Sequence, residues 1–309
     1  MMSKLAFVFP GQGSQQVGML SEFLDAFPKV SDVFAEASDA LGYDMKSLIL
    51  DGPAEELNKT EKTQPALVTA STALYQVWCQ QMEQTPALFA GHSLGEYSAL
   101  VASGALGFAD ALKLVELRGQ LMQQAVPAGE GMMAAILGLS DEQVVEGCAK
   151  ASEGAVVSAV NFNTPGQVVI AGEKAAVERA MLVLKEMGAK RAMPLAVSVP
   201  SHCALMKPAA DKLASEFDAI QFNTPSAPIV QNRTAKAVTD VSEIKANLLE
   251  QLYQPVLWTG SIEYIVSAGA TEILECGPGK VLTGLNKRIA KELTHTVLGD
   301  LSSFQQRLG

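Results

Sequence analysis

The chain has 309 residues, of which 48% are hydrophobic and only 18% are charged, and its formal net charge is −10 at pH 7. This length and composition are typical of a globular α/β enzyme with one large core and a smaller inserted or appended unit, and they exclude a disordered or fibrous chain. The negative charge argues against a nucleic-acid partner, and no stretch is long and apolar enough to span a bilayer.

Residues 4–10 predict a short buried strand that runs into the glycine loop GQGSQ. A strand followed by a glycine loop suggests a dinucleotide site, but the G-x-G-x-x-G fingerprint requires glycine or alanine at Gln16 and a later acidic residue. Both features are missing, so we favour a loop whose backbone approaches a reacting group closely, with Gln12 as a donor to an oxyanion. The same stretch has no small-residue cleavage site, which argues against secretion.

Apolar residues recur at helical spacing over residues 21–41 and again over 64–81, with no strand between the two stretches. Gln64 precedes a proline that suits the first turn of the second helix. Its side chain either caps that helix in solvent or lines a pocket, and the pattern leaves both possibilities open.

Residues 86–106 predict a strand, a sharp corner and a helix, with Ser93 at the corner. Gly91, Ser93 and Gly95 form G-x-S-x-G, the nucleophile elbow, in which a strained serine exposes its hydroxyl between two tiny neighbours. The backbone N–H of Leu94 stands at the helix start, where it can stabilise an oxyanion on a substrate carbonyl. A chance match in a glycine-rich loop is the alternative, but the strand before and the helix after favour a nucleophile.

Residues 109–125 predict an amphipathic helix, and Arg118 falls on its apolar face. An arginine in this position is rarely buried without a partner, because an unpaired buried charge is costly. We therefore expect either a carboxylate of the protein or an anionic ligand beside it. A side chain that extends to solvent is the ordinary alternative.

The pattern changes over residues 129–197, where the predicted order is strand, helix, strand, strand, helix, strand. This βαββαβ order is typical of ferredoxin-like domains. We therefore expect an α/β fold in which a large domain, residues 1–128 and 198–309, has a mostly parallel sheet and carries a small ferredoxin-like inserted domain, residues 129–197.

The three histidines leave two candidate bases for the serine. The side chain of His92 should point away from the hydroxyl of its neighbour Ser93. His202 comes where the chain returns to the large domain, whereas Ser93, Glu275 and His295 follow the chain order of an α/β-hydrolase, so a serine hydrolase is an alternative function. A hydrolase should have several strands before its elbow and an HGGG-like loop, and the sequence has neither. Spacing thus favours His202 but leaves His295 open.

The four cysteines lie far apart and form no CxxC pair. We therefore expect reduced thiols, no metal site and a cytoplasmic protein.

Several blocks of sequence, taken together, resemble the malonyl-CoA:acyl-carrier-protein transacylases over the full length of the chain. They are FPGQGSQ, GHSLGEYSAL, the helix arginine Arg118, VPSHCALM, QPVLW and GPGKVLTGL. The resemblance implies transfer of a malonyl group from coenzyme A to the phosphopantetheine thiol of holo acyl carrier protein, through a serine-bound malonyl ester in a ping-pong scheme of bacterial type II fatty acid biosynthesis. It implies no cofactor, because both thioesters are substrates, and no membrane partner; we expect a monomer.

The resemblance also implies the roles of the reacting residues. Ser93 would be the nucleophile and His202 the general base. Gln251 would hold the histidine ring through a neutral oxygen, which gives a dyad without a carboxylate. Gln12 and Leu94 would supply the N–H groups of the oxyanion hole.

Substrate binding is assigned by the same resemblance. Arg118 would pair with the free malonyl carboxylate, which is the anionic partner that its apolar surroundings require. Gln64, Asn161 and Asn232 match polar positions that line the pocket of the family.

Overall fold

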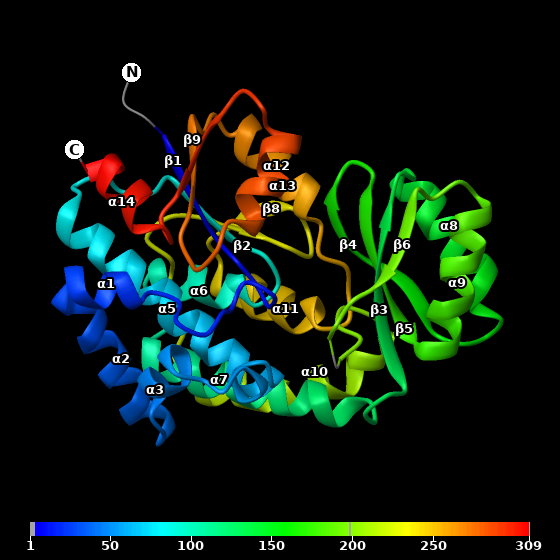
Figure 1. Ribbon diagram of the computed structural model, residues 1–309, viewed down its shortest axis with the longest axis horizontal. Helices are drawn as coiled ribbons and strands as arrows, with labels where there is room; N and C mark the ends of the chain where they lie inside the picture. Colours follow the sequence, from blue (N-terminus) through cyan, green and yellow to red (C-terminus); the bar gives the residue numbers. More distant parts are fainter. Residues whose placement is uncertain (1–3, 198, 309) are drawn as a thin grey trace.

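The structure is a computed structural model, and it describes residues 4–197 and 199–308 (Figure 1). It has two parts, one built around a six-stranded sheet and the other around a four-stranded sheet. The expected mixed α/β fold is thereby confirmed. The predicted domain boundary at residue 198 lies outside the described residues.

The larger sheet has the strand order β10-β9-β1-β2-β7-β8. Neighbouring strands are parallel except for the edge pair of β7 with β8, as expected for a mostly parallel sheet. The central strands β1 and β2 are buried at every residue, which explains their unbroken apolar sequences. The strands are β1 Leu5–Phe9, β2 Leu88–Gly91, β7 Ile229–Gln231, β8 Lys236–Val238, β9 Glu272–Glu275 and β10 Thr294–Val297.

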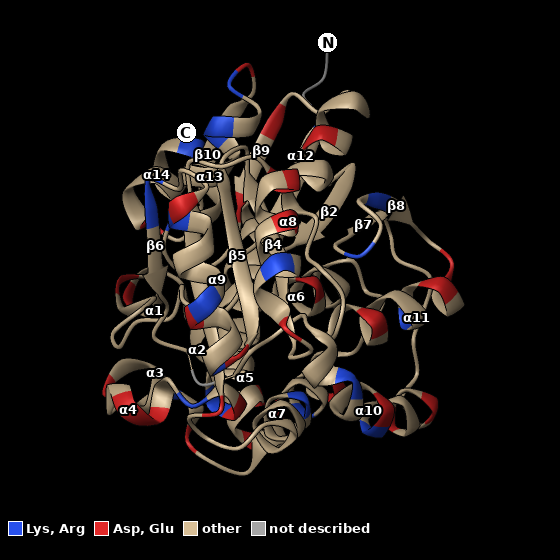
Figure 2. Cartoon of the chain, turned by 90° about the vertical axis from the view of Figure 1, so that its right-hand side faces the viewer, with Lys and Arg blue, Asp and Glu red and all other residues tan. Residues whose placement is uncertain are grey.

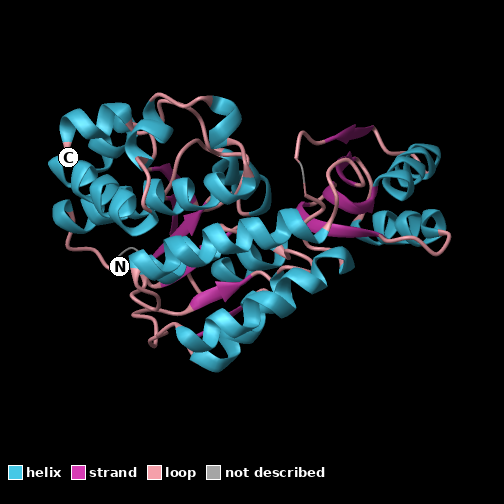
Figure 3. Ribbon diagram, turned by 90° about the horizontal axis from the view of Figure 1, so that it is seen from below, coloured by secondary structure: helices cyan, strands magenta, loops and turns pink. Residues whose placement is uncertain are grey.

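Helices lie on both sides of this sheet, as the view from below shows (Figure 3). The expected helical stretch 21–41 is divided into two helices, because Pro28 begins the second one and holds Phe27 in an extended conformation. The helices of the larger part are α1 Ser21–Ala26, α2 Pro28–Leu41, α3 Met45–Leu50, α4 Ala54–Leu57, α5 Thr60–Gln81, α6 Gly95–Ala102, α7 Phe108–Ala125, α10 Lys207–Ala219, α11 Val241–Gln251, α12 Trp258–Ser267, α13 Val281–Ile289 and α14 Leu301–Leu308, with a 3₁₀ turn at Ala204–Met206.

The smaller part has the expected βαββαβ order and an antiparallel sheet with the strand order β4-β5-β3-β6. Its two helices lie on the side of the sheet that faces away from the larger part (Figure 1). We refer to residues 131–197 as the insert; that 129–197 is a separate domain stays a prediction. Its elements are β3 Gly131–Leu137, α8 Asp141–Ser152, β4 Val157–Thr164, β5 Gln167–Glu173, α9 Lys174–Glu186 and β6 Arg191–Pro194.

Charged side chains of both signs are mixed on the helices. In Figure 2, α9 and α10 each carry acidic as well as basic residues, and Lys207 pairs with Asp211 on α10. None of the helices in the described ranges combines the length and apolarity that a bilayer crossing requires.

Candidate active site

Ser93 occupies the corner between β2 and α6 with a φ of 52°, in the left-handed region that a non-glycine residue rarely adopts. A Cβ atom on Gly91 would lie 1.9 Å from the carbonyl carbon of Gly95, and one on Gly95 would lie 2.1 Å from the carbonyl oxygen of Phe9. The residues two positions before and two positions after the serine must therefore be glycine. The second contact also shows that the corner packs directly against the end of β1.

The serine hydroxyl contacts a histidine. Ser93 Oγ lies 2.8 Å from His202 Nε2, and His202 Nδ1 lies 2.6 Å from the backbone carbonyl oxygen of Gln251. Because that carbonyl can only accept, Nδ1 carries the ring proton and Nε2 presents its lone pair to the hydroxyl. The histidine is thus oriented by a neutral oxygen, and both of its ring nitrogens have partners.

His202 is buried, with 3% of its surface exposed. The pKa of His202 is lowered from 6.5 to about 3, chiefly by burial; the hydrogen bond to the Gln251 carbonyl opposes this shift, and the nearby Arg118 and His92 add to it. The imidazole is therefore neutral at physiological pH, which is the protonation state that accepts a proton from serine.

Asn232 and Glu96 support the elbow from behind. Asn232 Oδ1 accepts a hydrogen bond from the Ser93 N–H at 2.6 Å, and its Nδ2 donates to the Gly91 carbonyl at 2.6 Å. The carboxyl group of Glu96 accepts from the Asn232 N–H at 2.7 Å and from Gln251 Nε2. Asn232 was expected to line the substrate pocket; instead it is fully buried, and its amide group is occupied in holding the elbow.

Glu96 was missed by the sequence reasoning. It lies in the first turn of α6, is 1% exposed, and burial raises its pKa to about 8. The available signal was an acidic residue within an otherwise apolar helix, which burial makes costly unless the group is hydrogen-bonded.

Arg118 is 1% exposed and bonds to two neutral amides. Nη1 donates to Gln64 Oε1 at 2.8 Å and Nη2 donates to Gln251 Oε1 at 3.1 Å, while Nε is buried without a hydrogen-bond partner among the described residues. Burial lowers the pKa of this guanidinium, and Tyr97 and Glu96 counteract the effect. Gln64 is buried and is therefore not a solvent-exposed helix cap. Its side chain accepts a hydrogen bond from Arg118 and does not line the Ser93 cavity.

A cavity of about 110 Å³ lies between the larger part and the insert, in front of Ser93. We refer to it as the Ser93 cavity. Its lining residues come from both parts and are Gln12, His92, Ser93, Leu94, Arg118, Met122, Met133, Asn161, Leu195, Val197, Val199, Ser201 and His202. Asn161 is one of these lining residues, and its Oδ1 is buried and unpaired among the described residues; that it contacts the substrate stays a prediction.

Gln12 and Leu94, the two predicted oxyanion donors, both line this cavity. Leu94 is the residue before the first turn of α6, so its backbone N–H belongs to the helix N-terminus. Gln12 lies in the loop after β1, with its Nε2 3.4 Å from Thr60 Oγ1. A second opening, of about 440 Å³, shares Gln12 with the Ser93 cavity and adjoins it.

The alternative hydrolase set is not assembled. Both carboxylate oxygens of Glu275 accept from backbone N–H groups at the start of α13, at 3.0 and 2.7 Å. His295 Nε2 donates to the Ala290 carbonyl at 2.8 Å, and neither residue lines the Ser93 cavity. The hydrolase alternative is therefore wrong, because the acid caps a helix and the histidine closes a loop.

Comparison with known proteins agrees with this geometry. A family model described as "Acyl transferase domain" matches residues 6–292. The malonyl CoA-acyl carrier protein transacylase of Escherichia coli K12 is 59% identical over 307 residues, which cover 99% of each chain. The Bacillus subtilis protein of the same name is 47% identical over 305 residues, covering 98% of this chain and 96% of that one.

Solved structures give the same result. An acyl carrier protein S-malonyltransferase from Vibrio cholerae superimposes with a TM-score of 0.97 at 57% identity, covering 99% of this chain and 100% of that one. A malonyl-transacylase solved in complex with its type II PKS acyl-carrier protein has a TM-score of 0.97 at 55% identity, covering 99% of both chains.

Proposed function

The chain belongs to the acyl transferase domain family and, within it, to the malonyl CoA-acyl carrier protein transacylases, and from this premise we propose how its residues transfer a malonyl group from coenzyme A to acyl carrier protein. The observation that carries the proposal is the 2.8 Å contact between Ser93 Oγ and His202 Nε2 in a cavity that also contains Arg118.

Acylation of Ser93 is the first half of the reaction. His202 Nε2 takes the hydroxyl proton while Oγ attacks the thioester carbonyl, and the tetrahedral oxyanion is held by the N–H groups of Gln12 and Leu94. Collapse expels the coenzyme A thiol, which receives the proton from His202, and leaves a malonyl ester on Ser93. The Gln251 carbonyl stabilises the transient imidazolium through Nδ1.

Arg118 binds the free carboxylate of the malonyl group. Its Nε has no hydrogen-bond partner among the described residues and is a donor for that carboxylate, while Gln64 and Gln251 fix the guanidinium. Because the charge of Arg118 lowers the pKa of His202, a bound carboxylate offsets that charge and raises the basicity of the imidazole. Binding of the malonyl group thus makes His202 a stronger base for the transfer of that same group.

The second half reverses the first with a different thiol. The phosphopantetheine thiol of holo acyl carrier protein enters the site that coenzyme A has left, loses its proton to His202 and takes the malonyl group from Ser93. Since both thioesters are substrates, the scheme needs no cofactor. We place the reaction in fatty acid biosynthesis in the cytoplasm and take the enzyme as a monomer, with Asn161 as a polar contact to the acyl group.

Intact-mass measurement after mixing with malonyl-CoA alone tests the proposal. The protein should gain one malonyl group, peptide mapping should find it on Ser93, and holo acyl carrier protein or coenzyme A should release it faster than water does. Absence of an adduct, or an adduct on Cys203, would refute the assignment.

A further inference from the structure

Strand β4 attaches the insert to the larger part. It is the edge strand of the small sheet, so its outer side is available for bonding. The Val256 N–H donates to the Val160 carbonyl at 2.8 Å, and the Phe162 N–H donates to the Val256 carbonyl at 3.0 Å. The pairing of β4 with the segment around Val256 therefore determines the position of the insert relative to the larger part.

A side-chain hydrogen bond fixes β4 on the side of the Ser93 cavity. His92 Nε2 donates to Asn163 Oδ1 at 2.8 Å, and Asn163 is only 8% exposed. The His92 ring packs on the indole of Trp258, with 5.4 Å between ring centroids. One hydrogen bond thus connects the residue next to Ser93 with the strand that contributes Asn161 to the cavity wall.

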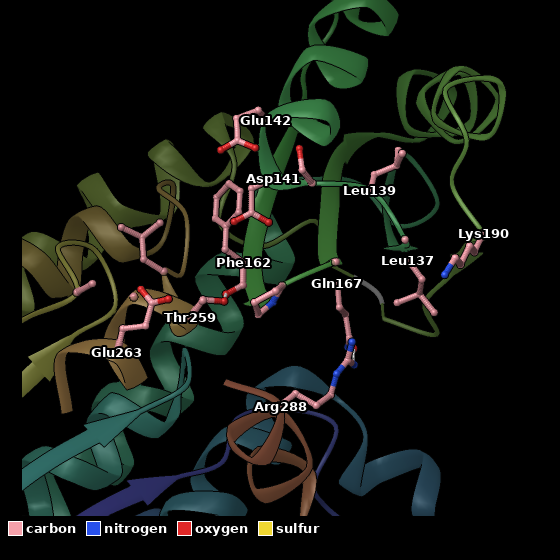
Figure 4. A pocket seen from close by; sticks show the side chains of 17 residues that line it. Leu137, Leu139, Asp141, Glu142, Phe162, Gln167, Lys190, Thr259, Glu263 and Arg288 are labelled. Atoms are coloured by element: carbon pink, nitrogen blue, oxygen red, sulfur yellow. Dashed lines mark hydrogen bonds between the residues drawn. The ribbon is translucent and has the colours of Figure 1, made fainter. Parts of the chain in front are cut away.

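Two other contacts join the insert to the larger part at a separate cavity of about 1000 Å³, which has no lining residue in common with the Ser93 cavity (Figure 4). Thr259 Oγ1 donates to the Phe162 carbonyl at 3.1 Å, and Arg288 Nη1 donates to Gln167 Oε1 at 2.9 Å. None of these four residues lines the Ser93 cavity. They provide attachments that can be removed without touching its wall.

The larger part determines the distance between Ser93 and Arg118, and the insert contributes to the wall beside them. Ser93 and Arg118 both belong to the larger part, so the distance from the ester to the carboxylate partner, and hence the length of the acyl group, is independent of the insert. The insert contributes Met133, Asn161, Leu195 and Val197 to the wall of the cavity, and the larger part contributes the other lining residues, Met122, Val199 and Ser201 among them. A displacement of the insert therefore changes the room beside the acyl group, where a branch on the carbon between the two acyl carbonyls would lie, and leaves Ser93 and Arg118 in place.

We propose that His92 and Asn163 are a positioning pair that holds the insert wall against the acyl group and so excludes malonyl groups that carry a branch on their central carbon. The inference rests on the proposed malonyl transfer. Asn163 acts through Asn161 and its neighbours on the wall, His92 is in addition part of the cavity lining, and neither residue takes part in the chemistry at Ser93.

The test compares three acyl-CoA substrates in the wild type and in Asn163→Ala. Methylmalonyl-CoA adds one methyl branch, whereas succinyl-CoA adds one methylene along the chain. A single methyl group in a close-fitting pocket changes discrimination by about 10- to 200-fold. We expect kcat/KM for methylmalonyl-CoA relative to malonyl-CoA to rise about tenfold in the variant, with the succinyl to malonyl ratio unchanged.

Thr259→Val is the matched control, because it removes an attachment of the same strand at the separate cavity; its ratios should equal those of the wild type. Asn163→Asp retains an acceptor oxygen for His92 and should keep the wild-type ratio. The proposal is overturned if Asn163→Ala changes all three substrates by one factor, or if Thr259→Val gives the same gain.

If Asn163→Ala melts below the assay temperature, Asn163→Leu removes the same hydrogen bond at similar side-chain volume and leaves every residue that lines the Ser93 cavity unchanged, so the same substrate ratios are then measured in that variant. A wild type that forms no malonyl ester on Ser93 would instead contradict the proposed function, so the two failures are distinguishable.

Discussion

Replacing Arg118 with alanine should reduce malonyl transfer and leave acetyl transfer intact. The guanidinium is 1% exposed and is held by two amide oxygens, with Nε unpaired among the described residues, so a carboxylate in the cavity meets preoriented donors. Hydrogen bonds to charged groups contribute roughly 1.5 to 3 kcal/mol, and an unpaired buried carboxylate costs more. At about 1.4 kcal/mol per decade, Arg118→Ala should lower kcat/KM for malonyl-CoA by about 10- to 1000-fold.

The assay measures kcat/KM for malonyl-CoA and acetyl-CoA in the wild type and in Arg118 variants, with a thermal melt of each. Acetyl-CoA has no carboxylate to lose, so its transfer should be unchanged or faster in Arg118→Ala. Arg118→Gln keeps an N–H donor for Gln64 or Gln251 but removes the positive charge. This variant therefore distinguishes loss of the hydrogen bonds to these two amides from loss of carboxylate binding. Arg118→Lys should rescue only in part, because a point charge cannot reproduce the fork. A parallel fall of both substrates in a folded alanine variant would refute this reasoning.

Three further predictions follow from the site. His202→Ala should lower transfer by about 10²- to 10⁴-fold and His295→Ala by only a few-fold; because burial lowers the pKa of His202, a pH series for the wild type should show no acid limb near 6.5. Gly91→Ala should strongly lower the melting temperature, since its Cβ would lie 1.9 Å from a backbone carbon; an unchanged melt contradicts the elbow geometry. Glu96 keeps its proton to about pH 8 in the folded state but releases it near 4.5 when the chain is unfolded. The free energy of unfolding of the wild type should therefore decrease as the pH rises from 4.5 to 8, by up to about 1.4 kcal/mol per pH unit. Chemical denaturation at several pH values should show that the free energy of unfolding of Glu96→Gln decreases less with rising pH than that of the wild type. An equal pH dependence in the two proteins would exclude Glu96 as its source.

The elbow was predictable because its determinants are local. Gly91, Ser93 and Gly95 impose the corner through contacts within one short segment, and the helix follows at once. The order of elements in the insert was predictable for a similar reason, since alternating strand and helix periods specify it. The close approach of Gly95 to Phe9 was not predictable, because it depends on how β1 and β2 pair.

The direction of single polar side chains was much harder to infer. Gln64 and Asn232 were both expected at the pocket, yet one holds Arg118 and the other braces the elbow. The residues next to them in the sequence do not indicate whether these side chains line the pocket or bond to other residues. Their direction depends on which donor or acceptor the tertiary fold brings within hydrogen-bond distance. Glu96 shows the same limit, because its backbone partner Asn232 lies 136 positions away in the chain.

The partners of Arg118 explain how one site can be both stable when empty and selective when occupied. A protein carboxylate bonded directly to the guanidinium would satisfy its charge and occupy the donors that a substrate needs. Amide oxygens of Gln64 and Gln251 orient the fork without neutralising it, and the nearest acidic group in this network, Glu96, is separated from it by the Gln251 amide. The remaining positive charge weakens His202 as a base until an anion arrives. A malonyl group carries such an anion and an acetyl group does not, so the proposed pairing of Arg118 with the malonyl carboxylate would bind the correct substrate and also make the imidazole of His202 more basic.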